Sequence, residues 1–184
     1  GDTVVIGAGT FTGTVALNKS VKVIGQGAAN TTVNGGGSNG FNVTADGLSA
    51  TNRMEVRDLT VTGAARGVNV NSNADYLTFQ GVTFNGNTAT GISFDVASTS
   101  VDATIQDCQF LSTVNGVRVH STGIVNLLTI DGCTFTGNTG GGFYSGDASS
   151  AALVGPNLTD LIVSDNTFTS NGAASNQTGI YIER

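Results

Sequence analysis

Six residues of this sequence have side chains that could hold a sugar or abstract a proton, and they recur at related places. They occur in segments in which a glycine precedes alternating apolar residues: GFNV from 40, GVNV from 67, GISF from 91, GVRV from 116, GFYS from 142 and GIYI from 179. Alternate residues of a strand point to opposite faces, so the residues between the apolar ones point outward. The six are Asp95, Arg118, His120, Tyr144, Tyr181 and Glu183. If the segments lie side by side, these residues share one outer face.

This outer face could bind an acidic polysaccharide. Arg118 could hold a uronate carboxylate through two parallel hydrogen bonds, and the rings of Tyr144 and Tyr181 could stack on sugars. A polysaccharide lyase needs a base and a group that neutralises the uronate, which Asp95 or His120 beside Arg118 could supply. The simpler interpretation is that surface residues of a strand share this face by accident.

A glycoside hydrolase is harder to build from these side chains. Its two carboxyl groups must lie ~5–9.5 Å apart, whereas Asp95 and Glu183 would be three segments apart, or ~14 Å at the strand spacing of a sheet. Asp147 in the following loop could replace one of them. Because no complete catalytic set is visible, we expect a protein that is not an enzyme. A lyase-like activity of Asp95, Arg118 and His120 is the alternative.

A repeat of about 25 residues would align these segments. The glycine segments begin 24 to 37 residues apart, and a second landmark, an apolar residue followed five positions later by Val or Phe, keeps a similar period. Each repeat contains three short stretches of period 2, which indicate strands, and none of helical period. One such repeat cannot bury its apolar face alone, but stacked repeats can. We therefore predict an all-β parallel β-solenoid with about seven turns and three short strands per turn.

Like residues should form columns in the interior of such a solenoid. Each side chain buried there stabilises the fold by ~1.5–3 kcal/mol. The predicted columns are Val68, Ile92, Val117, Phe143 and Ile180; Val56, Phe79, Ile105, Ile130 and Val163; and Val61, Phe84, Phe110, Phe135 and Phe168.

Threonines recur on another outer face of the predicted solenoid. The pairs are Thr60 and Thr62, Thr83 and Asn85, Gln109 and Leu111, Thr134 and Thr136, and Thr167 and Thr169. Such arrays resemble those of ice-binding proteins, but Gln109 and Leu111 interrupt this one, and threonine is also common on the solvent side of strands.

The string VSDNTFTSN…GIYI resembles the right-handed parallel β-helix repeat of the pectin-lyase-like superfamily, and the opening VVIGAGTFTGTVALNKSVKVIGQG resembles its first turns. The resemblance implies a right-handed β-helix over essentially the whole chain and a polysaccharide cleft on the outer face described above. It does not carry over the catalytic residues of the methylesterases, polygalacturonases or epimerases of the superfamily. The same fold supports enzymes and non-enzymatic surface proteins.

The resemblance also implies an inward asparagine ladder at Asn166, whose equivalents are Leu59, Val82, Cys108 and Cys133. The two cysteines would then lie on adjacent turns with Cα atoms ~5 Å apart, within the range of a disulfide. Their parallel Cβ directions would strain the bond, and two buried packing thiols are the alternative. Two cysteines do not make a zinc site, and we expect no metal and no cofactor.

Composition excludes several classes of partner. The net charge is −6 with seven Lys and Arg and no basic run, so clustered cations for nucleic acid are missing. No apolar run approaches the ~20 residues of a membrane span, so we expect no membrane insertion.

Residues 1–184 should form a single β-helix domain within a longer protein, because no capping element is visible at either end of the solenoid. Neighbouring domains or other copies would cover these ends. We expect a non-catalytic extracellular or cell-surface module, structural or adhesive, that binds glycans weakly through Asp95, Arg118, His120, Tyr144, Tyr181 and Glu183. A polysaccharide lyase and a head-to-tail fibre subunit are the alternatives.

Overall fold

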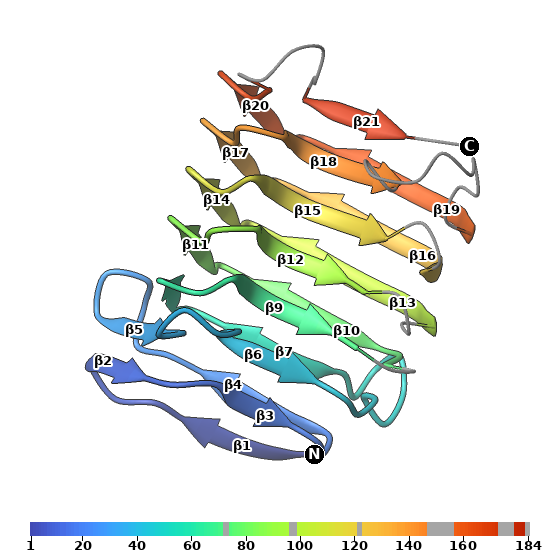
Figure 1. Cartoon of the computed structure of the whole chain (residues 1–184). Coiled ribbons are helices and arrows are strands. Elements are labelled where there is room, and N and C mark those ends of the chain that lie inside the picture. Colours follow the sequence, from blue (N-terminus) through green and yellow to red (C-terminus); the bar gives the residue numbers. More distant parts are fainter. Residues whose placement is uncertain (72–73, 96–98, 121–122, 147–156, 173–178, 183–184) are drawn as a thin grey trace.

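The protein is a parallel β-solenoid whose chain winds through three sheets in turn (Figure 1). The computed structural model describes residues 1–71, 74–95, 99–120, 123–146, 157–172 and 179–182. Among these residues each sheet contains seven strands, and neighbouring strands of each sheet pair in parallel. No helix in the described part of the chain is long and apolar enough to cross a bilayer.

The strands of each sheet come from successive passes of the chain. Sheet A contains β1 (Asp2–Val5), β4 (Val21–Ile24), β7 (Met54–Arg57), β10 (Leu77–Gln80), β13 (Thr99–Gln106), β16 (Ile124–Asp131) and β19 (Asn157–Ser164). Sheet B contains β2 (Gly9–Thr12), β5 (Thr31–Asn34), β8 (Thr60–Thr62), β11 (Thr83–Asn85), β14 (Gln109–Leu111), β17 (Thr134–Thr136) and β20 (Thr167–Thr169). Sheet C contains β3 (Val15–Leu17), β6 (Phe41–Val43), β9 (Arg66–Val70), β12 (Thr90–Phe94), β15 (Asn115–His120), β18 (Gly141–Gly146) and β21 (Ile180–Ile182).

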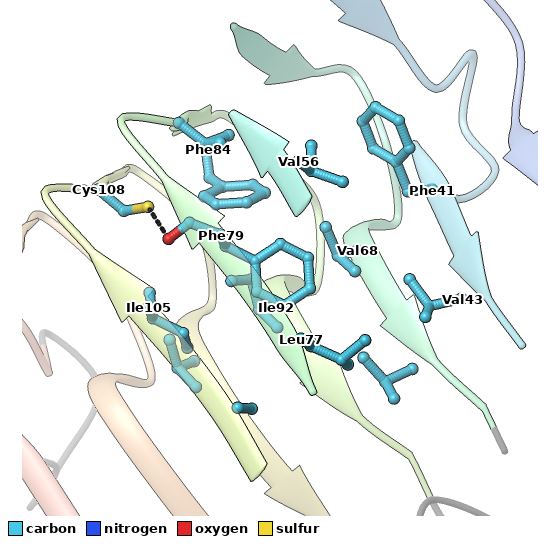
Figure 2. Close-up of a cluster of buried hydrophobic side chains, with 14 of the residues drawn as sticks. Phe41, Val43, Val56, Val68, Leu77, Phe79, Phe84, Ile92, Ile105 and Cys108 are labelled. Carbon is cyan, nitrogen blue, oxygen red and sulfur yellow. Dashed lines mark hydrogen bonds between the residues drawn. The ribbon is translucent and has the colours of Figure 1, made fainter. Parts of the chain in front are cut away.

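The register of the sheets confirms the alignment of the three predicted columns. Their members are buried except on the last turn, where Val163 and Phe168 are partly buried and Ile180 is 39% exposed. In sheet B the pairings place Val61, Phe84, Phe110, Phe135 and Phe168 one above another. Successive phenylalanine rings of this column are nearly parallel, with centroids 5.0, 4.7 and 4.7 Å apart. Figure 2 shows one member, Phe84, among apolar side chains of the other two sheets such as Phe79 and Val68, all fully or almost fully buried.

Glycine recurs at the start of the sheet C segments because the backbone there lies directly against the phenylalanine column. A Cβ on Gly91 would lie 2.5 Å from Cδ1 of Phe110 and 2.6 Å from the carbonyl oxygen of Gly116 on the next turn. Gly67 and Gly116 meet the equivalent atoms at the same distances. A larger residue would therefore collide both with a ring and with the neighbouring backbone.

Two left-handed bends in each repeat explain much of the rest of the repeated string. From β7 onward, the residue after each sheet A strand has a positive φ, at Asp58, Gly81, Asp107, Gly132 and Asp165. From β8 onward, the residue after each sheet B strand does so, at Gly63, Gly86, Ser112, Gly137 and Ser170. Glycine and aspartate tolerate this conformation better than most residues, so segments such as IDGCTFTGN encode corners of the scaffold.

The predicted ladder column is present, and its two cysteines are free thiols. The backbone N–H of Cys108 donates to Sγ of Cys133 at 3.4 Å, and the Cys108 thiol points to the carbonyl oxygen of Phe79 at 3.5 Å (Figure 2). At the next position of the column Asn166 accepts from the Cys133 N–H at 2.7 Å and donates to the Ile130 carbonyl at 2.8 Å.

A second inward ladder follows sheet B and was not predicted. Its members Asn87, Thr113 and Asn138 are buried. Asn138 Oδ1 accepts from the Thr113 N–H at 3.1 Å and from its hydroxyl at 2.7 Å, and its Nδ2 donates to the Phe110 carbonyl at 3.1 Å and to Asn171 Oδ1 at 2.8 Å. These amides satisfy backbone groups at the corners where no strand partner reaches them.

Candidate functional site

The predicted outer column exists on sheet C. The strand register aligns six residues across six neighbouring strands: Asn42, Asn69, Ser93, Arg118, Tyr144 and Tyr181. Asp95 directly follows β12 and His120 ends β15, each one residue beyond the paired Phe94 and Val119. The structure therefore brings Asp95, Arg118 and His120 to two adjacent turns, while Glu183 and the alternative carboxylate Asp147 lie outside the described residues.

The two tyrosines of the column form a stack, but only one of them is accessible. The ring of Tyr144 lies 5.0 Å from that of Tyr181 with an interplanar angle of 10°, and the guanidinium carbon of Arg118 lies 5.9 Å from the Tyr144 centroid. Tyr144 is only 5% exposed, whereas Tyr181 is 37% exposed. Tyr181 can offer its ring to a ligand, and Tyr144 supports it from below.

Arg66 belongs to this face although the sequence pattern did not indicate it. It begins β9, pairs in register with Thr90, and places Nη2 3.6 Å from Oδ2 of Asp95. Arg66 precedes the landmark glycine, so it falls outside the outward positions counted in the glycine segments. The rarity of cations in this chain is the one signal that could have drawn attention to it.

Two polar residues beneath the charged side chains form a buried floor. Asn69 and Ser93 are paired across β9 and β12, and they are only 5% and 3% exposed although they point outward. Oδ1 of Asn69 has no hydrogen-bond partner. The sheet C face therefore carries one cluster of polar side chains, formed by Arg66, Asn69, Ser93 and Asp95.

The other outer faces differ from that of sheet C. The outward columns of sheet B, which contain the predicted threonine array with its interruption at Gln109 and Leu111, have no charged residue among the described positions. On or beside sheet A, Lys22 pairs with Glu55, and Arg53 bonds both carboxylate oxygens of Asp102 at 2.9 Å.

Two further features do not add a site. An apolar hollow of about 240 Å³ lies at the first strands and is lined mainly by Val4, Ile6, Val15, Leu17 and Val23, so it is part of the solenoid interior rather than of the sheet C face. Within the described ranges no three His, Cys, Asp or Glu residues are grouped closely enough to hold a metal ion.

Comparison with known proteins identifies the family of this chain. The model of the right-handed β-helix region matches residues 10–158, most of the chain. The chain is a right-handed parallel β-helix protein. No curated protein matches this β-helix in a sequence search.

Solved structures share the β-helix fold at low identity. ORF18 of Geobacillus virus E2 matches with a TM-score of 0.67 and 15% identity, covering 98% of this chain and 42% of that one. The catalytic domain of a GH87 α-1,3-glucanase in complex with tetrasaccharides matches with a TM-score of 0.59 and 17% identity, covering 92% of this chain and 34% of that one. This β-helix therefore spans less than half the length of either structure, and identities this low show the fold alone.

Proposed function

We propose that this β-helix is a non-catalytic extracellular or cell-surface module that binds glycans on the outer face of sheet C. The observation that carries the proposal is the concentration of Arg66, Asp95, Arg118, His120 and Tyr181 on this face, because charged, planar and aromatic side chains are suited to sugar hydroxyls and ring faces. The sheet B face offers only uncharged side chains at its described positions.

The glucanase neighbour supports this proposal by analogy. It was solved in complex with tetrasaccharides, so a scaffold of the same fold holds a glycan. Asp95 is the one described carboxylate in the columns of Arg118 and His120, which favours binding over a two-carboxylate hydrolysis.

Binding to a panel of immobilised polysaccharides tests the proposal. The protein should bind at least one glycan, and Arg118→Ala and Tyr181→Ala should each weaken that binding by about tenfold, as expected for losing a charged hydrogen bond or a stacked ring. Thr134→Ala on sheet B is the matched control and should bind like the original protein. Binding that survives both sheet C substitutions but is lost in the control would place the site elsewhere.

A polysaccharide lyase is the second candidate, favoured by the arrangement of Asp95, Arg118 and His120 on adjacent turns. A lyase would release unsaturated sugars from uronate polymers, which absorb in the ultraviolet. Product formation that disappears in His120→Ala and in Arg118→Ala would establish this activity and overturn the non-catalytic assignment.

A further inference from the structure

The buried floor of the sheet C face contains a polar atom that the fold does not satisfy. Asn69 is 5% exposed, points outward from β9, and its Oδ1 accepts no hydrogen bond. Buried polar groups are nearly always paired, so an unpaired one in a folded protein needs an explanation. Asn42, one strand earlier in the same column, is unlike it because its Oδ1 accepts from Nδ2 of Asn39 at 2.8 Å.

An ion pair flanks this atom on both sides. Arg66 lies three residues before Asn69 on β9, and Asp95 lies two residues after Ser93, the register partner of Asn69. Nη2 of Arg66 is 3.6 Å from Oδ2 of Asp95, so the arginine side chain runs along the outer face between them. The Arg66 side chain is 36% exposed and that of Asp95 is 17% exposed, and their 3.6 Å separation is longer than a charge-assisted hydrogen bond of about 2.7–2.9 Å. A ligand with suitable hydroxyl groups could therefore take their place.

We propose that Arg66, Asn69 and Asp95 form a subsite for a neutral sugar residue. Oδ1 of Asn69 accepts a hydrogen bond from one sugar hydroxyl, the Asp95 carboxylate accepts from the adjacent hydroxyl, and the Arg66 guanidinium donates to a hydroxyl oxygen. Because Arg66 already faces a carboxylate of the protein, this subsite needs no carboxylate on the sugar, unlike the uronate binding expected of Arg118. The proposal rests on the glycan-binding function proposed above.

The test compares neutral and acidic ligands of equal length by titration calorimetry, using oligosaccharides of glucans, galactans and mannans against oligogalacturonates. We expect a neutral oligosaccharide to bind more tightly than any oligogalacturonate. Asn69→Ala should lower the affinity for the neutral ligand by about tenfold, which corresponds to the loss of roughly one hydrogen bond. The matched control Asn42→Ala should leave it unchanged.

Thermal stability separates recognition from a structural role. Since Asn69 Oδ1 lacks a partner in the free protein, Asn69→Ala should keep or raise the melting temperature while it lowers affinity. Equal binding of acidic and neutral ligands, or an Asn69→Ala variant that binds like the original protein, would overturn the subsite while leaving glycan binding intact. Absence of binding by every oligosaccharide would overturn the proposed function and the subsite together.

Discussion

The ring of Phe135 lies against the backbone of Gly116, so closely that a Cβ on Gly116 would be 2.5 Å from Cδ1 of the ring. The same relationship joins Gly67 to Phe84 and Gly91 to Phe110. The two sequence landmarks, a glycine in sheet C and a phenylalanine in sheet B, are therefore two sides of one contact. It fixes the distance between the phenylalanine column and the strands that carry the candidate site.

Gly116→Ala should lower the free energy of unfolding by about 1–3 kcal/mol, because the added methyl group must displace a ring or the Gly142 carbonyl oxygen 2.6 Å away. Urea denaturation measures this change. Gly7→Ala is the control, since no atom lies within 4 Å of its Cβ position and its φ is not positive. Equal effects of the two substitutions would contradict the role of the contact.

Asn138→Ala should destabilise the protein by at least about 1–3 kcal/mol, because it leaves the buried N–H of Thr113 and the carbonyl of Phe110 without their side-chain partner. The exposed Asn85, on the outer face of β11, provides a matched substitution to alanine that should be nearly neutral. The comparison is made by thermal and urea unfolding, and a neutral Asn138→Ala would show that the second ladder contributes little.

The buried Cys108 thiol should make the protein less stable in alkali. Burial raises the pKa of Cys108 well above its ordinary value, so above pH ~8.5 the unfolded chain releases a proton that the folded chain keeps. The hydrogen bond with Cys108 lowers the pKa of Cys133 instead, so Cys133 adds no loss of stability above this pH. Stability should then fall by about 1.4 kcal/mol per pH unit from Cys108 until the folded pKa is reached.

The double variant Cys108→Val and Cys133→Val isolates this effect. Valine is a reasonable replacement because Val82 occupies the same column one turn earlier. Urea denaturation under reducing conditions at pH 8 and pH 10 should show a smaller loss of unfolding free energy for the variant than for the original protein. These two pH values lie on either side of the ordinary thiol pKa of about 8.5. Equal losses of stability in the two proteins would mean that Cys108 ionises as easily in the folded state as in the unfolded chain.

The fold could be predicted from the sequence because the residues that determine it recur with a regular period. A repeated glycine and phenylalanine fix the register, and register alone determines the outward column from Asn42 to Tyr181. The second ladder was not predicted, although Asn87 and Asn138 each lie three residues after a column phenylalanine. The family resemblance implies only the ladder position of Asn166.

The composition of the candidate site was harder to predict because it depends on side-chain reach rather than register. Arg66 enters the face from a position before the repeat landmark, and only its extended side chain brings it to Asp95. Tyr144 occupies the predicted column yet is almost fully buried. Exposure of an outward residue is set by long neighbouring side chains, which period and pattern do not describe.

The most direct test of glycan binding on sheet C is to map the best-binding oligosaccharide by NMR, following backbone amide signals during titration. The account predicts saturable shifts at Asn69, Ser93, Arg118 and Tyr181, with the amides of Thr83 and Thr134 on sheet B unchanged. Shifts confined to sheet B or sheet A, with those four amides unmoved at saturation, would contradict it.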